Sequence, residues 1–337
     1  MTIDKVAELA YVSRSVVSRV LNGHSNVSDE ARRRVEEVIE EHDYRPSSVA
    51  RSLATDRSFE ISVLTPRRGD ESLATGYWSL LYSGIFERCL ERGYFVSLSM
   101  IGPGMEESVN DRIRDERFDG HILITQEVTD LLEASTLEHR DAPVVLIGRD
   151  PERMSIHSLD IDNAAGGYKA GIHLCDLGHE EIGLLLGMGQ LEETGERQQG
   201  AERALSEHGY VLPDERVAYT DYSPRSGYEA AREWIADGRM PSALFCAGDT
   251  IAMGALRALH EAGYRVPGDV ALVGFDGLPA SQYTTPPLTT VQQPVYEKGT
   301  RAADTLLDQI DGETSSGNHV TLEPELVVRE SCGARRT

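Results

Sequence analysis

Residues 3–23 read IDKVAELAYVSRSVVSRVLNG, and this stretch decides how the start of the chain folds. Apolar residues recur three and four positions apart on both sides of Ser13, which indicates one buried face on each of two helices: Val6, Leu9, Ala10, Val16, Val17, Val20 and Leu21. Ser13 suits the cap of the second helix, and Asn22-Gly23 suits its end. The pattern therefore predicts two short helices about a tight turn, a helix-turn-helix.

The polar face of the second helix has the residue types that read DNA bases. Its exposed side chains are Arg14, Ser15, Ser18 and Arg19. A short helix with such a face fits the major groove, where arginine binds guanine edges. A third helix is predicted for residues 28–42, because Pro46 disfavours helix in the residue before it. Its arginines at 32–34 are interpreted either as a solvated face or as phosphate contacts.

From Glu60 onward, apolar strands alternate with amphipathic helices. Strands are predicted at 61–65, 95–101, 121–125, 144–148, 182–187, 217–220, 243–247 and 270–275. Helices are predicted at 80–92, 109–117, 164–177, 197–208, 226–236, 251–262 and 295–310. This alternation is typical of parallel sheets with right-handed crossovers. The fold class is therefore α/β: an all-α head followed by two doubly wound parallel-sheet lobes.

Composition excludes several classes of protein. The 337 residues are 40% hydrophobic, and no run of about 18 apolar residues predicts a membrane span. The N-terminus has no apolar signal region, so a cytoplasmic location is expected. The four cysteines stand apart, as buried or unreactive thiols would, and no metal is expected. No phosphate loop, nucleophile elbow or dinucleotide fingerprint occurs, so the sequence indicates neither an enzyme nor a cofactor.

The net charge of −23 is unusual for a DNA-binding protein. Residues 1–58 hold nine Lys/Arg and ten Asp/Glu, so they are close to neutral, and the excess acid lies in the remainder. Only three lysines occur, Lys5, Lys169 and Lys298. Such a surface suits a cytoplasm of molar salt, where charge repulsion is screened. The alternative is an ordinary acidic protein from a genome that prefers arginine codons.

Motifs along the whole chain carry a family resemblance. They are Val12-Ser13-x-x-x-Val17-Ser18-Arg19-Val20-Leu21-Asn22, Pro46-Ser47-x-x-Ala50-Arg51-x-Leu53, Ile161-Asp162-Asn163-x-x-Gly166-Gly167, Gly178-His179, Arg197-x-x-Gly200, Gly248-Asp249-x-x-Ala252, Gly274-Phe275-Asp276 and Leu288-Thr289-Thr290-Val291-x-Gln293-Pro294. In this order they resemble the LacI/GalR family of bacterial transcriptional regulators, and most closely its purine-repressor type.

The resemblance implies the residues that contact DNA. Arg14, Ser15 and Arg19 would read bases, with a phosphate contact as the alternative for Arg14. The side chains of Ser13, Ser18 and Asn22 would bind phosphates or cap helices. Residues 46–54 would form a hinge helix in the minor groove, too short to be stable alone. Its contacts would be Ser47, Ala50, Arg51 and Leu53. Leu53 would be an apolar wedge that kinks the duplex, unless this segment is a plain linker.

The resemblance also implies a small effector between the lobes. Arg197 and Asp276 would hold its polar groups, and Tyr77, Trp78 and Tyr222 its apolar faces. Weaker candidates are Thr125, Arg149, Asp162 and Asp249. Each has an alternative: Asp249 is favoured as a helix cap, Asp276 could be a turn residue, and the two aromatics before residue 80 could belong to the core.

Departures from the purine-repressor pattern narrow the effector. Leu191 and Glu193 stand at expected purine-contact positions, and Gly148-Arg149 replaces an acidic-aromatic pair. These changes argue against guanine or hypoxanthine. The Arg/Asp pair with its aromatic residues instead suits a sugar or sugar phosphate, the effector class most common in the family that the chain resembles. The predicted protein is a homodimeric repressor of a pseudo-palindromic operator on double-stranded DNA. The alternative is a ligand-binding protein without operator specificity.

The expected domains follow from these elements. The head would be residues 1–45, the hinge 46–58 and the two-lobed part 59–337. Lobe 1 would comprise about 59–161 and 292–315, and lobe 2 about 162–291 and 316–332.

Overall fold

The computed structural model describes residues 1–21, 26–44, 57–66, 76–102, 105–124, 142–148, 156–313 and 317–334. It divides the chain into two compact units, Met1–Phe59 and Glu60–Thr337. The first unit is called the head and the second the body. In the described part of the chain, no helix is long and apolar enough to cross a membrane.

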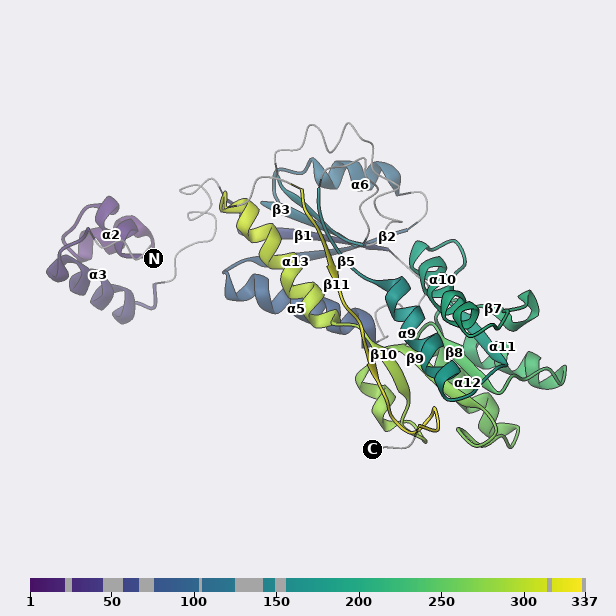
Figure 1. Cartoon of the computed structure of the whole chain (residues 1–337). Helices are drawn as coiled ribbons and strands as arrows, with labels where there is room; N and C mark the ends of the chain where they lie inside the picture. The colour runs from purple at the N-terminus through teal and green to yellow at the C-terminus, as the bar shows by residue number, and fades with distance from the viewer. Residues whose placement is uncertain are drawn as a thin grey trace. The chain divides into compact units, whose positions relative to one another are not determined.

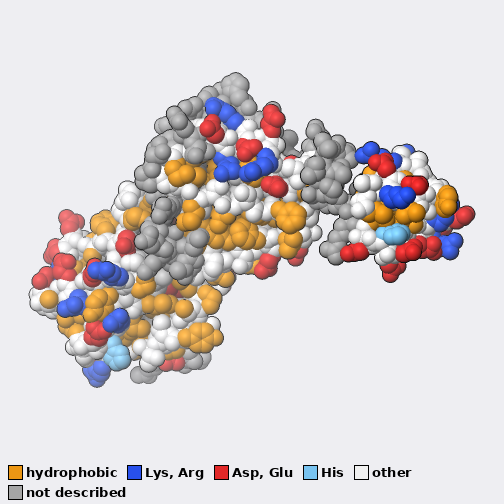
Figure 2. All heavy atoms as spheres, turned by 180° about the vertical axis from the view of Figure 1, so that it is seen from behind, with side chains coloured by type: hydrophobic (Ala, Val, Ile, Leu, Met, Phe, Trp, Pro, Cys, Tyr) orange, Lys and Arg blue, Asp and Glu red, His pale blue; other side chains and the backbone are white. Residues whose placement is uncertain are grey.

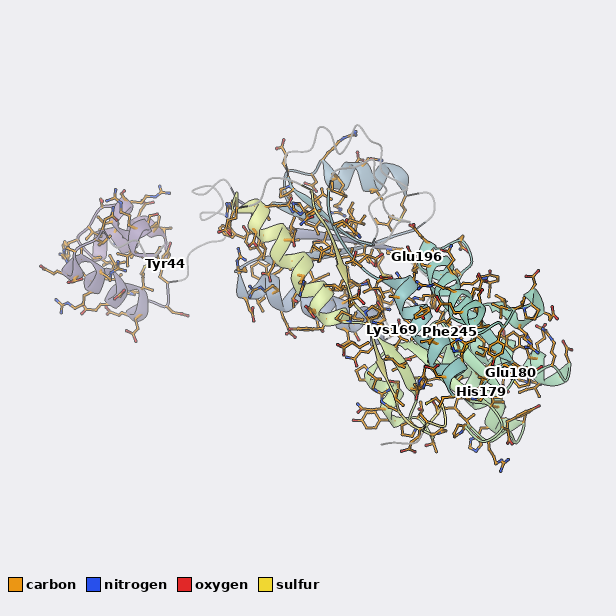
Figure 3. All side chains as sticks on the ribbon, viewed as in Figure 1. Tyr44, Lys169, His179, Glu180, Glu196 and Phe245 are labelled. Atoms are coloured by element: carbon orange, nitrogen blue, oxygen red, sulfur yellow. The ribbon has the colours of Figure 1, made fainter. Side chains whose placement is uncertain are left out.

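The head is a bundle of three helices, α1 (Ile3–Leu9), α2 (Arg14–Leu21) and α3 (Asp29–Glu41). Thr2 and Ser28 cap the first and third helices by accepting backbone N–H groups. The core that joins the three helices is made of Val6, Ala7, Ala10, Val17, Val20, Val35 and Tyr44; Tyr44 is labelled in Figure 3. The predicted helix-turn-helix and third helix are therefore confirmed, with bounds shifted by at most one residue for the third.

The first lobe of the body is built on a wholly parallel six-stranded sheet, in the order β11-β5-β4-β3-β1-β2. The strands are β1 (Glu60–Pro66), β2 (Phe95–Ile101), β3 (Gly120–Ile124), β4 (Val144–Ile147), β5 (His157–Ile161) and β11 (His319–Leu322). Helices α5 (Gly76–Glu91) and α13 (Val295–Ile310) pack side by side, with α6 (Glu106–Ile113) elsewhere on the sheet (Figure 1).

The second lobe repeats the plan with the sheet order β12-β10-β9-β8-β6-β7. Its strands are β6 (Ile182–Leu186), β7 (Val217–Tyr219), β8 (Ala243–Cys246), β9 (Ala271–Asp276), β10 (Thr289–Gln292) and β12 (Glu325–Val327). Only the pairing of β12 with β10 is antiparallel among these strands. Its α-helices are α9 (Asn163–Asp176), α10 (Glu192–Glu207), α11 (Pro224–Ala236) and α12 (Asp249–Glu261). Phe245 and Phe275 lie in the core under α9 (Figure 3 labels Phe245). Short 3-10 turns η1 (Asp214–Arg216) and η2 (Pro279–Tyr283) complete the lobe.

The chain crosses between the two sheets three times: after β5, after β10, and between β11 and β12. The prediction that 316–332 belongs to lobe 2 is wrong for β11, because residues 319–322 pair with β5 in the first sheet. β11 is a half-exposed edge strand in which only Val320 and Leu322 are apolar, so its sequence carries no strong strand pattern. The two-lobed α/β fold itself is confirmed.

Two glycines allow α9 and α10 to touch closely. A Cβ at Gly200 would lie 2.0 Å from the carbonyl oxygen of Ala164, and one at Gly167 would lie 2.0 Å from that of Arg197. Only glycine fits where backbones approach so closely. This contact fixes the position of the helix that carries Arg197.

Candidate functional site

The polar face of α2 in the head is open to solvent. Val17 and Val20 are buried, while Ser13, Arg14, Ser15 and Arg19 are exposed and Ser18 is half-buried. Within the described residues, Arg14 and Arg19 have no ion-pair partner, so both guanidinium groups are available to an anion or a base edge. Figure 2 shows basic and acidic side chains interleaved on the head. The other predicted DNA contacts, Asn22, Ser47, Ala50, Arg51 and Leu53, lie outside the described residues.

In the body, the candidate effector-binding residues of the second lobe lie around Arg197. It lies in the second turn of α10, so the expectation that it opens this helix is wrong. The Arg197 side chain is only 6% exposed, and two of its nitrogens have hydrogen-bond acceptors. Nε donates to Asn163 Oδ1 at 2.9 Å and Nη1 donates to the Ala247 carbonyl at 2.7 Å. Its guanidinium carbon lies 3.8 Å from the centroid of the Phe275 ring. These contacts hold the guanidinium in one orientation.

Asp276 follows at the carboxyl end of β9 and is 9% exposed. Its Oδ1 accepts from Gln293 Nε2 at 2.6 Å and lies 4.0 Å from Arg197 Nη1. Burial raises the pKa of Asp276 to about 6, and Arg197 opposes that shift. Its backbone φ of +103° is costly for a residue with a Cβ. The alternative that Asp276 is only a turn residue therefore does not account for its buried carboxylate and its contacts with Gln293 and Arg197.

Tyr222 lies in the same lobe and also has a positive φ, of +66°. Its hydroxyl shares a hydrogen bond with Thr194 at 3.0 Å. The ring covers Gly187 so closely that a Cβ there would lie 1.9 Å from it. Burial raises the pKa of Tyr222, so the phenol stays protonated.

In the first lobe, the aromatic pair of the prediction lies inside the first turn of α5, because that helix begins at Gly76 and not at residue 80. Trp78 is 8% exposed and stacks on Tyr82, which is the arrangement of the core alternative. Tyr77 meets Trp78 edge to face, with ring centroids 5.3 Å apart. The hydroxyl of Tyr77 accepts a hydrogen bond from Lys298 Nζ at 2.9 Å.

Lys298 is a candidate residue that sequence reasoning missed. It lies on α13 and is 3% exposed. Burial acts to lower the pKa of Lys298, but Tyr77 and Asp160 outweigh it and the pKa is raised, so the ammonium stays charged. Burial raises the pKa of Asp160, and Lys298 opposes that shift. A signal was present, because one of only three lysines stands on a helix stripe with Val295 and Ala302.

Two of the weaker candidates support the fold around the site. Asp162 is the cap of α9 and accepts from the Ala165 N–H at 2.7 Å. Asp249 does not cap α12, whose cap is Gly248. Its carboxyl group instead accepts from the Thr290 hydroxyl at 2.6 Å and the Leu278 N–H at 2.7 Å.

Burial, and next the charge of Asp276, raise the pKa of Asp249 to about 8. The capping prediction for Asp249 is therefore wrong, because the side chain supports the loop after β9. Thr125 and Arg149 lie outside the described residues.

Charged side chains of the two lobes lie close enough to interact electrostatically. The charge of Lys298 acts on both Asp276 and Arg197. These side chains, from the carboxyl ends of β5 and β9 and from α5, α10 and α13, form what is called the interlobe cluster: Tyr77, Asp160, Arg197, Asp276 and Lys298. Ligands of open α/β sheets bind at such strand ends. Within the described residues, no group of three or more His, Cys, Asp or Glu could hold a metal ion.

Comparison with known families and proteins gives a consistent result. Residues 2–47 match the family "Bacterial regulatory proteins, lacI family", and residues 172–332 match the "Periplasmic binding protein-like domain". The HTH-type transcriptional repressor PurR of Erwinia tasmaniensis is 34% identical over 98% of this chain and 96% of its own length.

Among solved structures, the lac repressor dimer bound to operator and the anti-inducer ONPF is similar over 99% of both chains, at 30% identity and a TM-score of 0.85. The complex of the transcriptional regulator CelR with cellobiose is 31% identical over 98% of this chain and 99% of its own, with a TM-score of 0.74.

Proposed function

Because the chain belongs to the lacI family of bacterial regulatory proteins, we propose that it represses transcription as a homodimer on a pseudo-palindromic operator, under the control of a small effector. The family relation makes it a transcriptional repressor with an effector-binding domain. The operator, the dimer, the effector class and the cytoplasmic location are parts of the proposal. A dimer presents two heads, which explains why such operators are palindromic.

The reading of DNA is assigned to α2 and the segment after the head. Arg14, Ser15 and Arg19 would contact bases, because they are exposed on one helix face and the two arginines have no ion pairs in the described part of the chain. Ser13, Ser18 and Asn22 would bind phosphates. Residues 46–54, with Ser47, Ala50, Arg51 and Leu53, would order in the minor groove once two subunits meet there.

The observation that carries the effector proposal is the Arg197–Asp276 pair. Both side chains are buried, and hydrogen bonds hold each of them in place: Arg197 donates to the Ala247 carbonyl, and Asp276 accepts from Gln293 at the carboxyl end of β9. A preorganised cation and carboxylate beside the Tyr222 phenol suit the hydroxyl groups of a sugar. Two solved structures that resemble this chain contain a small ligand: the lac repressor is bound to the anti-inducer ONPF, and CelR is bound to cellobiose.

Control would work through the angle between the lobes. A ligand that contacts both lobes stabilises one angle, and it shifts the equilibrium only by its differential affinity for the two states. Operator and effector must then alter each other's affinity by the same factor.

Anisotropy of a labelled duplex, selected by this protein from random sequences, tests the proposal from low to molar KCl. Arg19→Ala should reduce discrimination against a scrambled duplex by ~10-fold, because a bidentate base contact is worth about 1–3 kcal/mol. Arg33→Ala, which removes an exposed arginine of α3, is the control and should change only the salt-dependent part. Equal affinity for selected and scrambled duplexes at every salt concentration would leave only a ligand-binding protein.

A further inference from the structure

Lys298 is a buried cation whose hydrogen-bonding capacity is largely unused by the residues that the structure describes. Its side chain is 3% exposed on the apolar face of α13, and among the described residues Nζ donates one hydrogen bond, to the Tyr77 hydroxyl. Within the described residues, no carboxylate lies within 4.0 Å of this ammonium. A lysine ammonium has three donors. Burying such a charge without partners costs several kcal/mol, so a group that satisfies the remaining donors is expected.

The surroundings of Lys298 define what that group can be. Among the described residues, the charged side chains that act on one another here include two cations, Lys298 and Arg197, and the three carboxylates Asp160, Glu193 and Asp276. They come from β5, α10, β9 and α13, so both lobes contribute. Within this described set, negative charge exceeds positive charge by one, and a phosphate or carboxylate would add more negative charge in a site shielded from water.

We infer that Lys298, with Asp160, forms the first lobe's half of the effector site and restricts the effector to an uncharged polyhydroxyl compound. This inference rests on the proposed function and deepens it by excluding sugar phosphates and sugar acids. A hydroxyl group both donates and accepts, so one sugar edge can accept from Lys298 while donating to Asp160. The opposite edge meets Arg197 and Asp276 in the same way.

This arrangement also explains how the two lobes sense one ligand. Each lobe supplies one cation and one carboxylate to the interlobe cluster, Lys298 with Asp160 and Arg197 with Asp276. A ligand that has hydroxyls on only one edge satisfies one lobe alone. Only a ligand with hydroxyls on both edges contacts both lobes and so stabilises one angle between them, which gives the differential affinity that allostery requires.

The test uses the full-length dimer, Lys298→Met, Lys298→Arg and Asp160→Asn, with Arg301→Met as the matched control. Arg301 is an exposed cation on the same helix, paired with Glu297. Calorimetry measures the binding of glucose, cellobiose and ribose, and of glucuronate and glucose 6-phosphate as charged counterparts. Operator anisotropy without sugar is recorded for every variant, so a failure of DNA binding is separated from a failure of effector recognition.

Wild type should bind at least one uncharged sugar and neither anion. Lys298→Met should weaken the binding of that sugar ~10- to 100-fold, as expected for a hydrogen bond to a charged group, and Lys298→Arg should restore part of it. Asp160→Asn should raise the affinity for the anions relative to the uncharged sugar. Arg301→Met should change neither, and operator affinity without sugar should be the same in all variants.

Several results would overturn the inference. They are tighter binding of glucuronate or glucose 6-phosphate than of any uncharged sugar, no binding of any uncharged sugar in the panel, or equal sugar binding by Lys298→Met and wild type. Unchanged operator binding alongside any of these would leave the proposed repressor intact.

Discussion

The contact between α9 and α10 allows a sharp test, because α10 holds two glycines in opposite environments. At Gly200 an added Cβ would lie 2.0 Å from the Ala164 carbonyl oxygen and 2.7 Å from the Tyr168 nitrogen. At Gly195 it would meet nothing within 4 Å. The same change to alanine, made in the same helix, is therefore expected to have opposite signs.

The magnitudes follow from two terms. Replacing glycine by alanine in a helix gains about 0.5–1 kcal/mol, and Gly195→Ala should show this gain alone. At Gly200 the two backbones must separate by roughly 1 Å or more to restore an ordinary contact, which opens packing along both helices. Overpacking of this kind costs ~1–3 kcal/mol, so after the gain from alanine is subtracted Gly200→Ala should lose a net ~1–2 kcal/mol.

Urea unfolding of the body, followed by tryptophan fluorescence, measures both variants. Because Arg197 lies less than one turn before Gly200, effector affinity should also fall in Gly200→Ala and stay unchanged in Gly195→Ala. Equal stability of Gly200→Ala and Gly195→Ala would refute the close approach of the two helices.

Four further results are expected. Tyr11→Gly should stabilise the head by about 1 kcal/mol in hydrogen exchange, because Tyr11 has φ +54° and is 84% exposed; a loss would mean that its ring is held by contacts. The free energy of unfolding should fall as pH rises from about 4 to 8, by on the order of 1 kcal/mol per pH unit. The reason is that Asp249 loses its proton near its ordinary pKa in the unfolded chain, whereas burial raises its pKa to about 8 in the folded body. Asp249→Asn should flatten this slope, and an identical slope would contradict the assignment. The melting temperature should rise between 0.1 M and 2 M KCl if the net charge of −23 reflects a saline cytoplasm, whereas a flat response would favour the codon explanation. Leu53→Ala should weaken operator binding much more than non-specific binding, and equal losses on both DNAs would exclude a wedge.

Much of the fold could be predicted from periodicity. The strands buried along almost their whole length, such as β1, β3, β6 and β9, are mostly apolar, and the prediction found each of them within a residue of its ends. The strands it missed are β5, β10, β11 and β12, which are all short; polar residues make up half or more of β5, β10 and β11. Their pairing depends on partners far away in the sequence, which no local pattern reports.

The site was predicted less completely for a related reason. Arg197 and Asp276 belong to recognisable motifs, and the structure brings them within 4.0 Å. Lys298 belongs to no such motif, and its importance comes from burial beside Tyr77, which is 221 positions away. Asp249 looked like a helix cap because it precedes the helix predicted at 251–262, but its hydrogen-bond partners lie on β10 and in the loop after β9. The roles of Lys298 and Asp249 both depend on contacts with residues far away in the sequence, which a local sequence pattern does not report.

The three crossings of the chain have a consequence for biosynthesis. β11 and β12, near the end of the chain, are edge strands of different sheets, so neither lobe is complete until residues 319–327 have left the ribosome. The head has its own core within residues 1–59 and can fold as soon as it emerges. Every nascent chain therefore passes through a stage with a finished DNA reader on an unfinished body. A premature stop that removes the last two strands would damage both lobes together, and the head would be left attached to an unfinished body.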